Sequence, residues 1–244
     1  MATWVYEYAS GVVLTHTTTR PDGDFAIDAD PVGLAERRRR VADHPWVWLR
    51  QVHGSDVVVA TAPTAAAVVG STADAMVTAD ADLVLAVQTA DCVPVVLWSP
   101  GGIIGAAHAG WRGLEAGIIQ ATWAAMAELG AEDIRFHIGP HIGVECYEFG
   151  DDVADRLAAQ FGDRVRGTTL DGRPALDLGE ATRAAIEQVT GRPSPPRPRP
   201  RPQPSSMCTA CAPERWYSHR ARADRQRMAT VIWRESSYER AMSA

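Results

Sequence analysis

Apolar, β-rich runs dominate the first half of the chain, and they restrict its fold more than any other feature. Several of these runs are continuous in Val, Ile, Leu and Ala, as expected of strands that are covered on both faces. The predicted strands are residues 4–14, 46–53, 56–60, 83–88, 93–98 and 102–109. Gly101 and Gly102 stand between the last two runs and predict a hairpin turn.

Helical periodicity is clearer in the second half. Apolar residues recur at three-to-four spacing in residues 114–130, 151–161 and 177–191, and a final strand is predicted at 228–233. Strands and helices interleave irregularly, which favours a mixed-sheet α/β fold over regular βαβ winding. With 244 residues and 46% hydrophobic content, the chain is expected to form a single domain over residues 1–244.

One segment differs in composition from the rest. Residues 191–206 alternate Pro with Arg and Ser, a pattern typical of an extended, solvated polyproline-type segment. It could serve as a ligand for an SH3-like domain or as a basic contact arm. A surface insertion within the domain is the favoured interpretation, because too little chain follows to form a second core.

Charge and cysteine content exclude several classes of function. The net charge is −6 and the chain contains no lysine, so lysine Schiff-base chemistry is excluded and nucleic-acid binding is not indicated. There is no signal-peptide pattern and no window of about 18 apolar residues, so no membrane span is expected. The four cysteines predict free or metal-bound thiols in a reducing, cytoplasmic setting.

Three side chains that can bind a metal stand at the ends of apolar runs. They are His53 in QVHG, Cys92 in TADC and His108 in HAGWRG. Two imidazoles and a thiolate form a sound three-ligand zinc set that leaves a fourth position open. Two alternatives remain: Cys92 is a nucleophile with His108 as its base, or the three residues are ordinary core and turn residues.

Two further motifs are weaker. Arg112 precedes the predicted helix at residue 114, so it could help a helix N-terminus to bind a phosphate or a carboxylate, or it could be a surface arginine. Cys208 and Cys211 have CxxC spacing, but a structural zinc site needs more ligands nearby. Coincidence is the favoured interpretation of this spacing.

The order of several motifs is more specific than any one of them. WLRQVHGSDVV, ADAMVT, TADCVPVVL, GAAHAGWRG, IGPHIGVECYEFGDDV and WYSHRA occur in this order between residues 17 and 233. This series resembles the polyphenol oxidase/laccase-domain family, whose members are generally regarded as purine nucleoside phosphorylases. The resemblance implies a mixed α/β sandwich and a zinc site at His53, Cys92 and His108.

The same resemblance implies activities and substrates. These are phosphorolysis of adenosine, inosine, guanosine and methylthioadenosine, together with adenosine deamination. The family pattern departs at residues 20–31, where Arg20 is retained, and near residues 218–227, where Ser218 and Arg220 are retained but His219 replaces the usual tyrosine. These departures affect the substrate pocket more than the metal ligands.

General chemistry ranks these activities. A zinc-bound water near neutral pH suits attack on the amino-bearing purine carbon, and Asp74 or Asp91 could carry the proton or orient a ligand. Phosphorolysis needs a bound phosphate, which Arg112 or Arg220 could hold. Multicopper oxidation requires clustered histidines, and the seven histidines include no His-x-His pair. Copper is therefore a less suitable cofactor than Zn²⁺.

The sequence thus predicts a cytoplasmic zinc enzyme acting on purine nucleosides and phosphate, with no nucleic-acid or membrane partner. Two alternatives stay open. One is a cysteine hydrolase or transferase that uses Cys92 and His108, and the other is a nucleoside-binding protein without catalytic activity.

Overall fold

A computed structural model describes residues 3–8, 11–193 and 204–236 of the chain. Most of the Pro/Arg-rich insertion predicted at 191–206 lies outside these described residues. The described parts contain two five-stranded sheets and one small two-stranded sheet.

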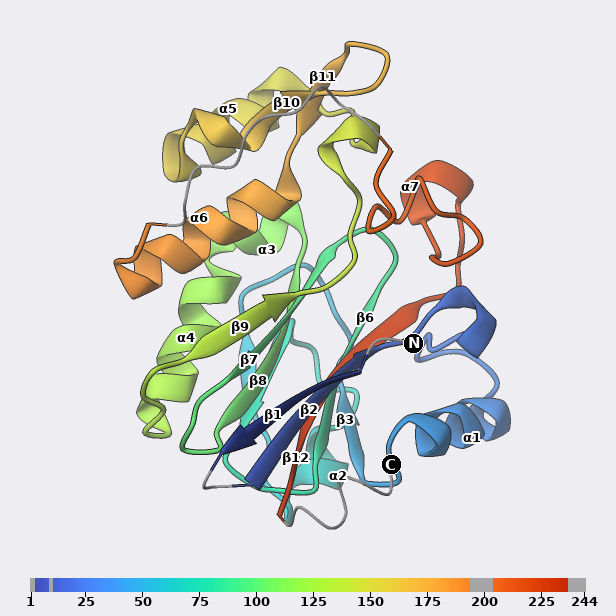
Figure 1. Cartoon of the computed structure of the whole chain (residues 1–244), viewed down its shortest axis with the longest axis vertical. Coiled ribbons are helices and arrows are strands. Elements are labelled where there is room, and N and C mark those ends of the chain that lie inside the picture. Colours follow the sequence, from blue (N-terminus) through green and yellow to red (C-terminus); the bar gives the residue numbers. More distant parts are fainter. Residues whose placement is uncertain (1–2, 9–10, 194–203, 237–244) are drawn as a thin grey trace.

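The first sheet has the order β1-β2-β12-β6-β3 and is antiparallel except where β3 pairs with β6. Its strands are β1 (Thr3–Tyr8), β2 (Gly11–Thr17), β12 (Met228–Glu235), β6 (Val84–Thr89) and β3 (Trp46–Trp48). The last strand, β12, therefore joins the first two strands in one sheet, where it lies between β2 and β6 (Figure 1).

The second sheet has the order β4-β5-β8-β7-β9, and only β4 and β5 run parallel in it. Its strands are β4 (Val57–Val59), β5 (Ala75–Thr78), β8 (Ile104–Ala109), β7 (Val93–Trp98) and β9 (Arg135–Ile138). The small sheet pairs β10 (Arg166–Thr168) with β11 (Pro174–Leu176).

Helices and short turns connect these strands. The α-helices are α1 (Pro31–Val41), α2 (Ala65–Val68), α3 (Trp111–Ala116), α4 (Ile118–Glu128), α5 (Asp151–Phe161), α6 (Leu178–Thr190) and α7 (His219–Arg222). The 3₁₀ turns are η1 (Arg20–Asp22), η2 (Val144–Cys146) and η3 (Asp163–Val165).

The core is divided into layers by the two sheets. Alternate residues of β7 face opposite sides: Val95 packs in the cluster formed with α3 to α6, and Val96 packs in the cluster between the sheets. On the far side of the first sheet, Leu34 of α1 packs in a third cluster. The result is a mixed α/β sandwich with helices outside both sheets (Figure 1), which confirms the predicted fold class.

The predicted elements agree closely with the structure where the apolar pattern is long. The runs at 93–98 and 151–161 coincide with β7 and α5. Residues 4–14 form two strands of a hairpin rather than one strand. The short strands β5, β9, β10 and β11 were missed because they have only three or four residues each.

The prediction of one continuous helix at 114–130 is wrong. Two helices occupy this region, and Gly117 separates them with a left-handed φ of 88°. The first helix already begins at Trp111, with Gly110 as its N-cap. Arg112 is therefore inside the first turn of α3 and not ahead of the helix.

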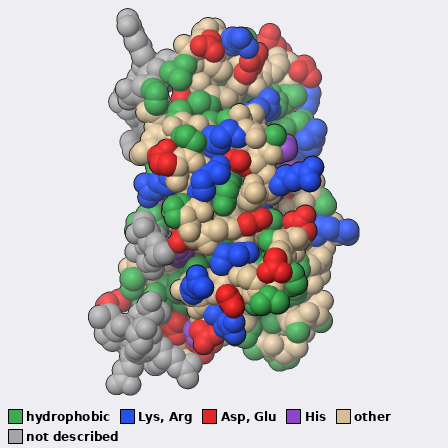
Figure 2. Space-filling model, turned by 90° about the vertical axis from the view of Figure 1, so that its right-hand side faces the viewer, with side chains coloured by type: hydrophobic (Ala, Val, Ile, Leu, Met, Phe, Trp, Pro, Cys, Tyr) green, Lys and Arg blue, Asp and Glu red, His purple; other side chains and the backbone are tan. Residues whose placement is uncertain are grey.

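None of the helices in the described parts of the chain is long and apolar enough to cross a bilayer. Figure 2 shows the face that carries α1 and α7, where arginine and acidic side chains are interspersed. The arginines on this face do not form one continuous basic block.

Candidate functional site

The three predicted metal-binding residues lie together. The candidate ligand atoms of His53, Cys92 and His108 are all within 4.8 Å of one another. His53 Nε2 is 3.7 Å from Cys92 Sγ, and the two imidazole ring centroids are 4.8 Å apart. No ligand atom has to move far for all three to reach one ion, since zinc–ligand bonds are about 2.0–2.3 Å long.

Sheet register brings Cys92 to His108. In the antiparallel pair β7–β8, Pro94 lies opposite His108 and Val93 opposite Ala109. Cys92 immediately precedes β7, so it lies beside the end of β8. His53 follows β3 and reaches the same place through a loop on which Arg50 bridges Thr72.

Asp74 holds both histidines in position. Its Oδ1 lies 2.8 Å from His108 Nδ1, and both side chains are buried. The backbone N–H groups of three residues donate to the same carboxylate, at 3.1, 2.9 and 2.7 Å from Val52, His53 and Gly54 respectively. With Nδ1 of His108 engaged, only Nε2 is left to face a ligand.

The backbone of His53 is strained. Its φ is 62°, a left-handed conformation that is uncommon for a residue with a Cβ. The three hydrogen bonds to Asp74 stabilise this turn and direct the imidazole toward Cys92. Burial raises the pKa of Asp74, but the hydrogen bonds from His108 and from this turn lower it below its ordinary value.

Two glycines allow this close packing. A Cβ on Gly110 would lie 2.6 Å from His53 Cδ2 and 3.1 Å from Cys92 Sγ. A Cβ on Gly113 would lie 3.1 Å from the Gly54 carbonyl oxygen. Gly110 has an ordinary φ of −81°, so its backbone conformation does not require glycine. The close approach of the His53 ring is the reason that a side chain does not fit at this position.

The charges of Cys92 and His108 are coupled. Burial raises the pKa of the Cys92 thiol, but the His108 and His53 rings outweigh burial and lower it to about 6. Burial lowers the pKa of His108, yet the Cys92 thiolate and the Asp74 carboxylate raise it to about 9. The thiolate form of Cys92, which metals and electrophiles require, is therefore favoured near neutral pH.

The donor set fits a zinc ion. Two imidazole nitrogens and one thiolate sulfur are the ligand types that zinc selects, and an exposed His53 leaves one side of the group open to solvent. The Asp74–His108 contact is the carboxylate–histidine arrangement that commonly supports such a ligand.

Asp91 does not contact the three ligands by hydrogen bonding. Its Oδ1 accepts from Thr209 Oγ1 and its Oδ2 from the backbone N–H of Arg220, both at 2.6 Å. Its backbone carbonyl accepts from Ile142 N–H at 2.9 Å. The residue has a φ of 107° and is buried. Asp91 thus fastens the C-terminal segment to the turn that carries Cys92.

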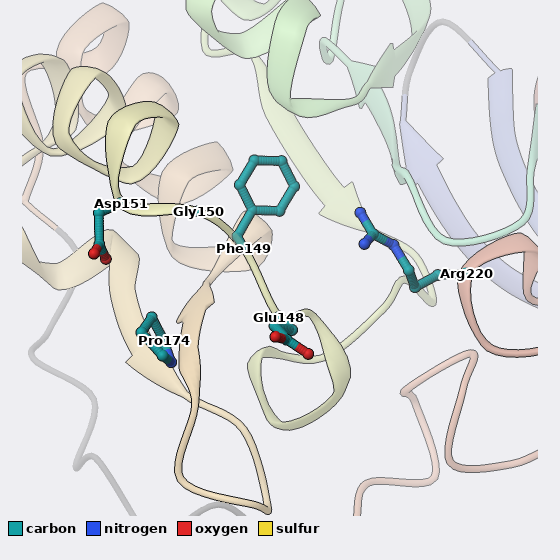
Figure 3. Close-up of a pocket in the computed structure, with 6 residues that line it drawn as sticks. All are labelled: Glu148, Phe149, Gly150, Asp151, Pro174 and Arg220. Carbon is teal, nitrogen blue, oxygen red and sulfur yellow. The ribbon is translucent and has the colours of Figure 1, made fainter.

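A pocket of about 380 Å³ has Arg220 on its wall, and none of the three candidate metal ligands lines it. Arg220 links the pocket to the Cys92 turn through its backbone N–H, which donates to Asp91. Figure 3 shows Arg220 facing the segment that carries Glu148 and Phe149, on the other side of which are Asp151 and Pro174. The Arg220 guanidinium lies 4.9 Å from the Tyr147 ring centroid and 5.8 Å from that of Phe149.

The sequence analysis did not single out the aromatic residues beside Arg220. Tyr147 and Phe149 pack together, and Trp111 meets Phe149 edge-on at 5.7 Å. Burial first, and Cys92 second, raise the pKa of Tyr147 to about 12. The Tyr-x-Phe pair directly ahead of α5 was the available signal.

The other predicted arginines are placed differently. Arg112 is exposed and stacks on Trp111, with 4.3 Å from its guanidinium carbon to the ring centroid. Arg20 donates to Asp224 Oδ2 at 2.7 Å and stacks on Tyr217 at 4.4 Å. The charge of Arg20 is therefore already paired. Arg220 lines the pocket, and Arg112 lies on Trp111, whose ring contacts Phe149 of the pocket wall.

Comparison with known proteins identifies the family of this chain. The family model described as "Multi-copper polyphenol oxidoreductase laccase" matches residues 21–235. The chain belongs to this family. The purine nucleoside phosphorylase ORF3 of Streptomyces griseus is 37% identical over 222 residues, which cover 85% of this chain and 84% of that protein.

Solved structures share the fold. The hypothetical protein YfiH of Bacillus licheniformis superposes with a TM-score of 0.77 at 27% identity, over 91% of this chain and 93% of that one. YlmD of Geobacillus stearothermophilus gives a TM-score of 0.74 at 30% identity, over 93% of each chain. The family resemblance noted in the sequence is confirmed.

Proposed function

We propose that this chain is a zinc-dependent purine nucleoside phosphorylase with a secondary adenosine deaminase activity. The observation that carries the proposal is the convergence of His53, Cys92 and His108, with Asp74 fixing the tautomer of His108. The name of the Streptomyces griseus relative supports the reaction class. The four free cysteines support a reducing, cytoplasmic location.

The three ligands would hold the zinc, which supplies Lewis-acid stabilisation of negative charge when bound. The chain itself supplies the rest of the site. Asp74 keeps His108 and the His53 turn in place, and Gly110 leaves room for the His53 ring. The half-buried ring of Phe149, on the pocket wall, offers an apolar surface on which a purine can stack, and Tyr147 packs beneath it.

Arg220 is the proposed phosphate-binding residue. In phosphorolysis, a phosphate oxygen forms a bond to C1′ of the ribose while the bond from C1′ to the purine nitrogen breaks. Ribose 1-phosphate and a free purine result. Arg220 lines the pocket and Arg112 lies beside Trp111, so both guanidiniums can orient a phosphate by charge-assisted hydrogen bonds.

Deamination is proposed as the lesser activity because it needs a proton carrier. Water replaces the purine amino group and ammonia leaves, so a proton must reach the leaving nitrogen. Asp74 accepts four hydrogen bonds and Asp91 accepts two, which ties both carboxylates to structural positions. Glu148 and Asp151 on the pocket wall are the remaining carboxylate candidates.

Multicopper oxidation is disfavoured by the ligand set. Among the described residues, the candidate metal groups contain at most two histidines each. The coppers of a multicopper oxidase need several imidazoles in one place. Five histidines of this chain lie outside the His53, Cys92, His108 group: His16, His44, His137, His141 and His219.

Activity assays on the zinc-loaded protein test the proposal. Adenosine with phosphate should yield adenine and ribose 1-phosphate in equal amounts, and omission of phosphate should abolish both. Inosine should form slowly with or without phosphate. Cys92→Ser and His108→Ala should lose both activities, while His137→Gln, outside every candidate metal group, should retain them.

Two results would count against the proposal. Zinc-bound, folded protein that yields no product from adenosine, inosine, guanosine or methylthioadenosine would favour a binding protein. Activity that persists in metal-free protein, with a covalent adduct on Cys92, would instead favour the cysteine-nucleophile alternative.

A further inference from the structure

A second group of metal-binding side chains lies outside the candidate active site. Glu145 and Cys146 belong to η2, and Cys208 and Cys211 come from the segment ahead of α7. Their candidate ligand atoms all lie within 4.8 Å of one another. The CxxC pair, which lacks sufficient ligands in the sequence around it, thus gains a third thiol and a carboxylate from a distant part of the chain.

The sulfur atoms of this group face one another closely. Cys146 Sγ lies 3.3 Å from Cys211 Sγ, and the Cys211 thiol is 3.5 Å from Glu145 Oε1. Cys208 Sγ accepts a hydrogen bond from the Gly143 N–H at 3.2 Å. Cys208 is buried and the other two thiols are half-buried.

Backbone contacts hold the two segments in this register. His141 forms a bridge with Cys208, and Thr209 N–H donates to the His141 carbonyl at 3.1 Å. Ala212 N–H donates to the Cys208 carbonyl at 3.3 Å. This helical turn puts the Cys208 and Cys211 side chains on the same side, since residues three apart share a face.

Gly143 makes room for the carboxylate. A Cβ at this position would lie 2.1 Å from Glu145 Oε2, so any larger residue would force the carboxylate away. Glu145 is only 7% exposed. Buried carboxylates are found paired or bound to a metal, because desolvation of an isolated charge is costly.

We propose that Glu145, Cys146, Cys208 and Cys211 form a second metal site for a thiophilic divalent cation, with zinc as the expected ion. Three sulfur donors and one oxygen donor make a closed, four-coordinate set, which is typical of a structural zinc site. Binding of the cation releases the protons of the thiols that are still protonated.

This second ion would support the pocket wall. The η2 turn leads directly to Tyr147 and Phe149, and the Cys208–Cys211 segment leads to Arg220. Thr209, inside that segment, also donates to Asp91 next to Cys92. A cation that crosslinks η2 to residues 208–211 therefore fixes the aromatic residues and Arg220 relative to the first site. The inference does not depend on the reaction proposed above.

Metal analysis tests the proposal. Protein prepared under reducing conditions with zinc should contain about two zinc ions per chain after removal of free metal. Cys146→Ser/Cys211→Ser should contain about one, as should Cys92→Ala/His108→Ala, and the combined variant should contain almost none. The first two variants are matched controls for each other, because each removes one ligand group only.

Cobalt substitution identifies the ligands. In the Cys92→Ala/His108→Ala background, bound Co²⁺ should still show an intense sulfur-to-cobalt charge-transfer band. Adding Cys146→Ser/Cys211→Ser should abolish this band. If the serine variant fails to fold, Glu145→Gln gives a milder change and should weaken zinc binding by about tenfold.

Alkylation of the wild-type protein supplies an independent readout. Zinc should slow modification of Cys146 and Cys211 by iodoacetamide, and chelation should restore it. Overturning results would be an unchanged zinc content in the folded Cys146→Ser/Cys211→Ser variant, or equal alkylation rates with and without zinc. A mass about 2 Da lower under reducing preparation, from a Cys146–Cys211 disulfide, would also overturn the site.

Discussion

The Asp74 carboxylate lies 2.8 Å from Nδ1 of His108, and the same carboxylate accepts the N–H group of His53. One buried acid thus fixes two of the three candidate metal ligands. Asp74 directly precedes β5, so this strand positions the carboxylate although it carries no candidate ligand itself.

Asp74→Asn should weaken zinc binding by roughly tenfold to a hundredfold. The neutral amide lacks the negative charge that strengthens the hydrogen bond from His108 and stabilises this ligand. Competition with a chromophoric chelator measures the change. Asp80→Asn is the control, since Asp80 Oδ2 accepts a backbone hydrogen bond from Ala62 on an exposed loop. Equal zinc affinity in Asp74→Asn and wild type would contradict the positioning role of Asp74.

Gly110→Ala should damage the site without unfolding the protein. The new methyl group would lie 2.6 Å from the His53 ring, so His53 must move away from Cys92. Zinc affinity and phosphorolysis should fall by roughly tenfold or more, with near-native circular dichroism. Gly101→Ala is the matched control because the nearest atom to its Cβ, Ser99 Oγ, is 3.7 Å away. Full activity in Gly110→Ala would show that the His53 position is not needed.

Arg220→Ala should raise the KM for phosphate by roughly tenfold or more, with a smaller effect on the KM for adenosine, because one charge-assisted contact is lost. Arg112→Ala should act in the same direction. Arg20→Ala is the comparison: Arg20 is paired with Asp224, so its loss should lower the melting temperature more than it changes the phosphate KM. Phosphate kinetics unchanged in Arg220→Ala would remove Arg220 from the site.

Acid should destabilise the fold through His16, which is buried, and His137, which is half-buried. Burial lowers the pKa of His16 and of His137 below the ordinary value of 6.5. The unfolded chain therefore binds more protons than the folded one as the pH falls through about 6.5, so the free energy of unfolding should decrease from pH 7 to pH 5.

Urea unfolding at several pH values checks this expectation. His137 packs against Trp4 with tilted rings whose centroids are 4.4 Å apart, and His137→Gln should make the pH dependence shallower. His219→Gln is the control, because this imidazole is exposed. An identical slope in wild type and His137→Gln would rule out His137 as a contributor.

Local pattern explains how much of the fold was predictable. The strands β6, β7 and β12 and the helices α5 and α6 follow from continuous or periodic apolar residues, whose burial dictates their conformation. The break at Gly117 was missed, since the apolar spacing continues across it and only the positive φ ends the helix. His53, Cys92 and His108 could be proposed as candidate ligands, because each places a metal-binding side chain at the end of an apolar run.

Tertiary structure alone decided which residues meet. The sequence by itself determined the mixed α/β class and supplied three candidate ligands for the first site, because apolar periodicity and side-chain chemistry are local properties. It left open the four hydrogen bonds on Asp74, the structural use of Asp91 and the joining of Glu145 and Cys146 with Cys208 and Cys211. These contacts depend on sheet register and on bridges between segments up to 129 positions apart, such as that from Arg220 to Asp91, and no local pattern encodes such distances.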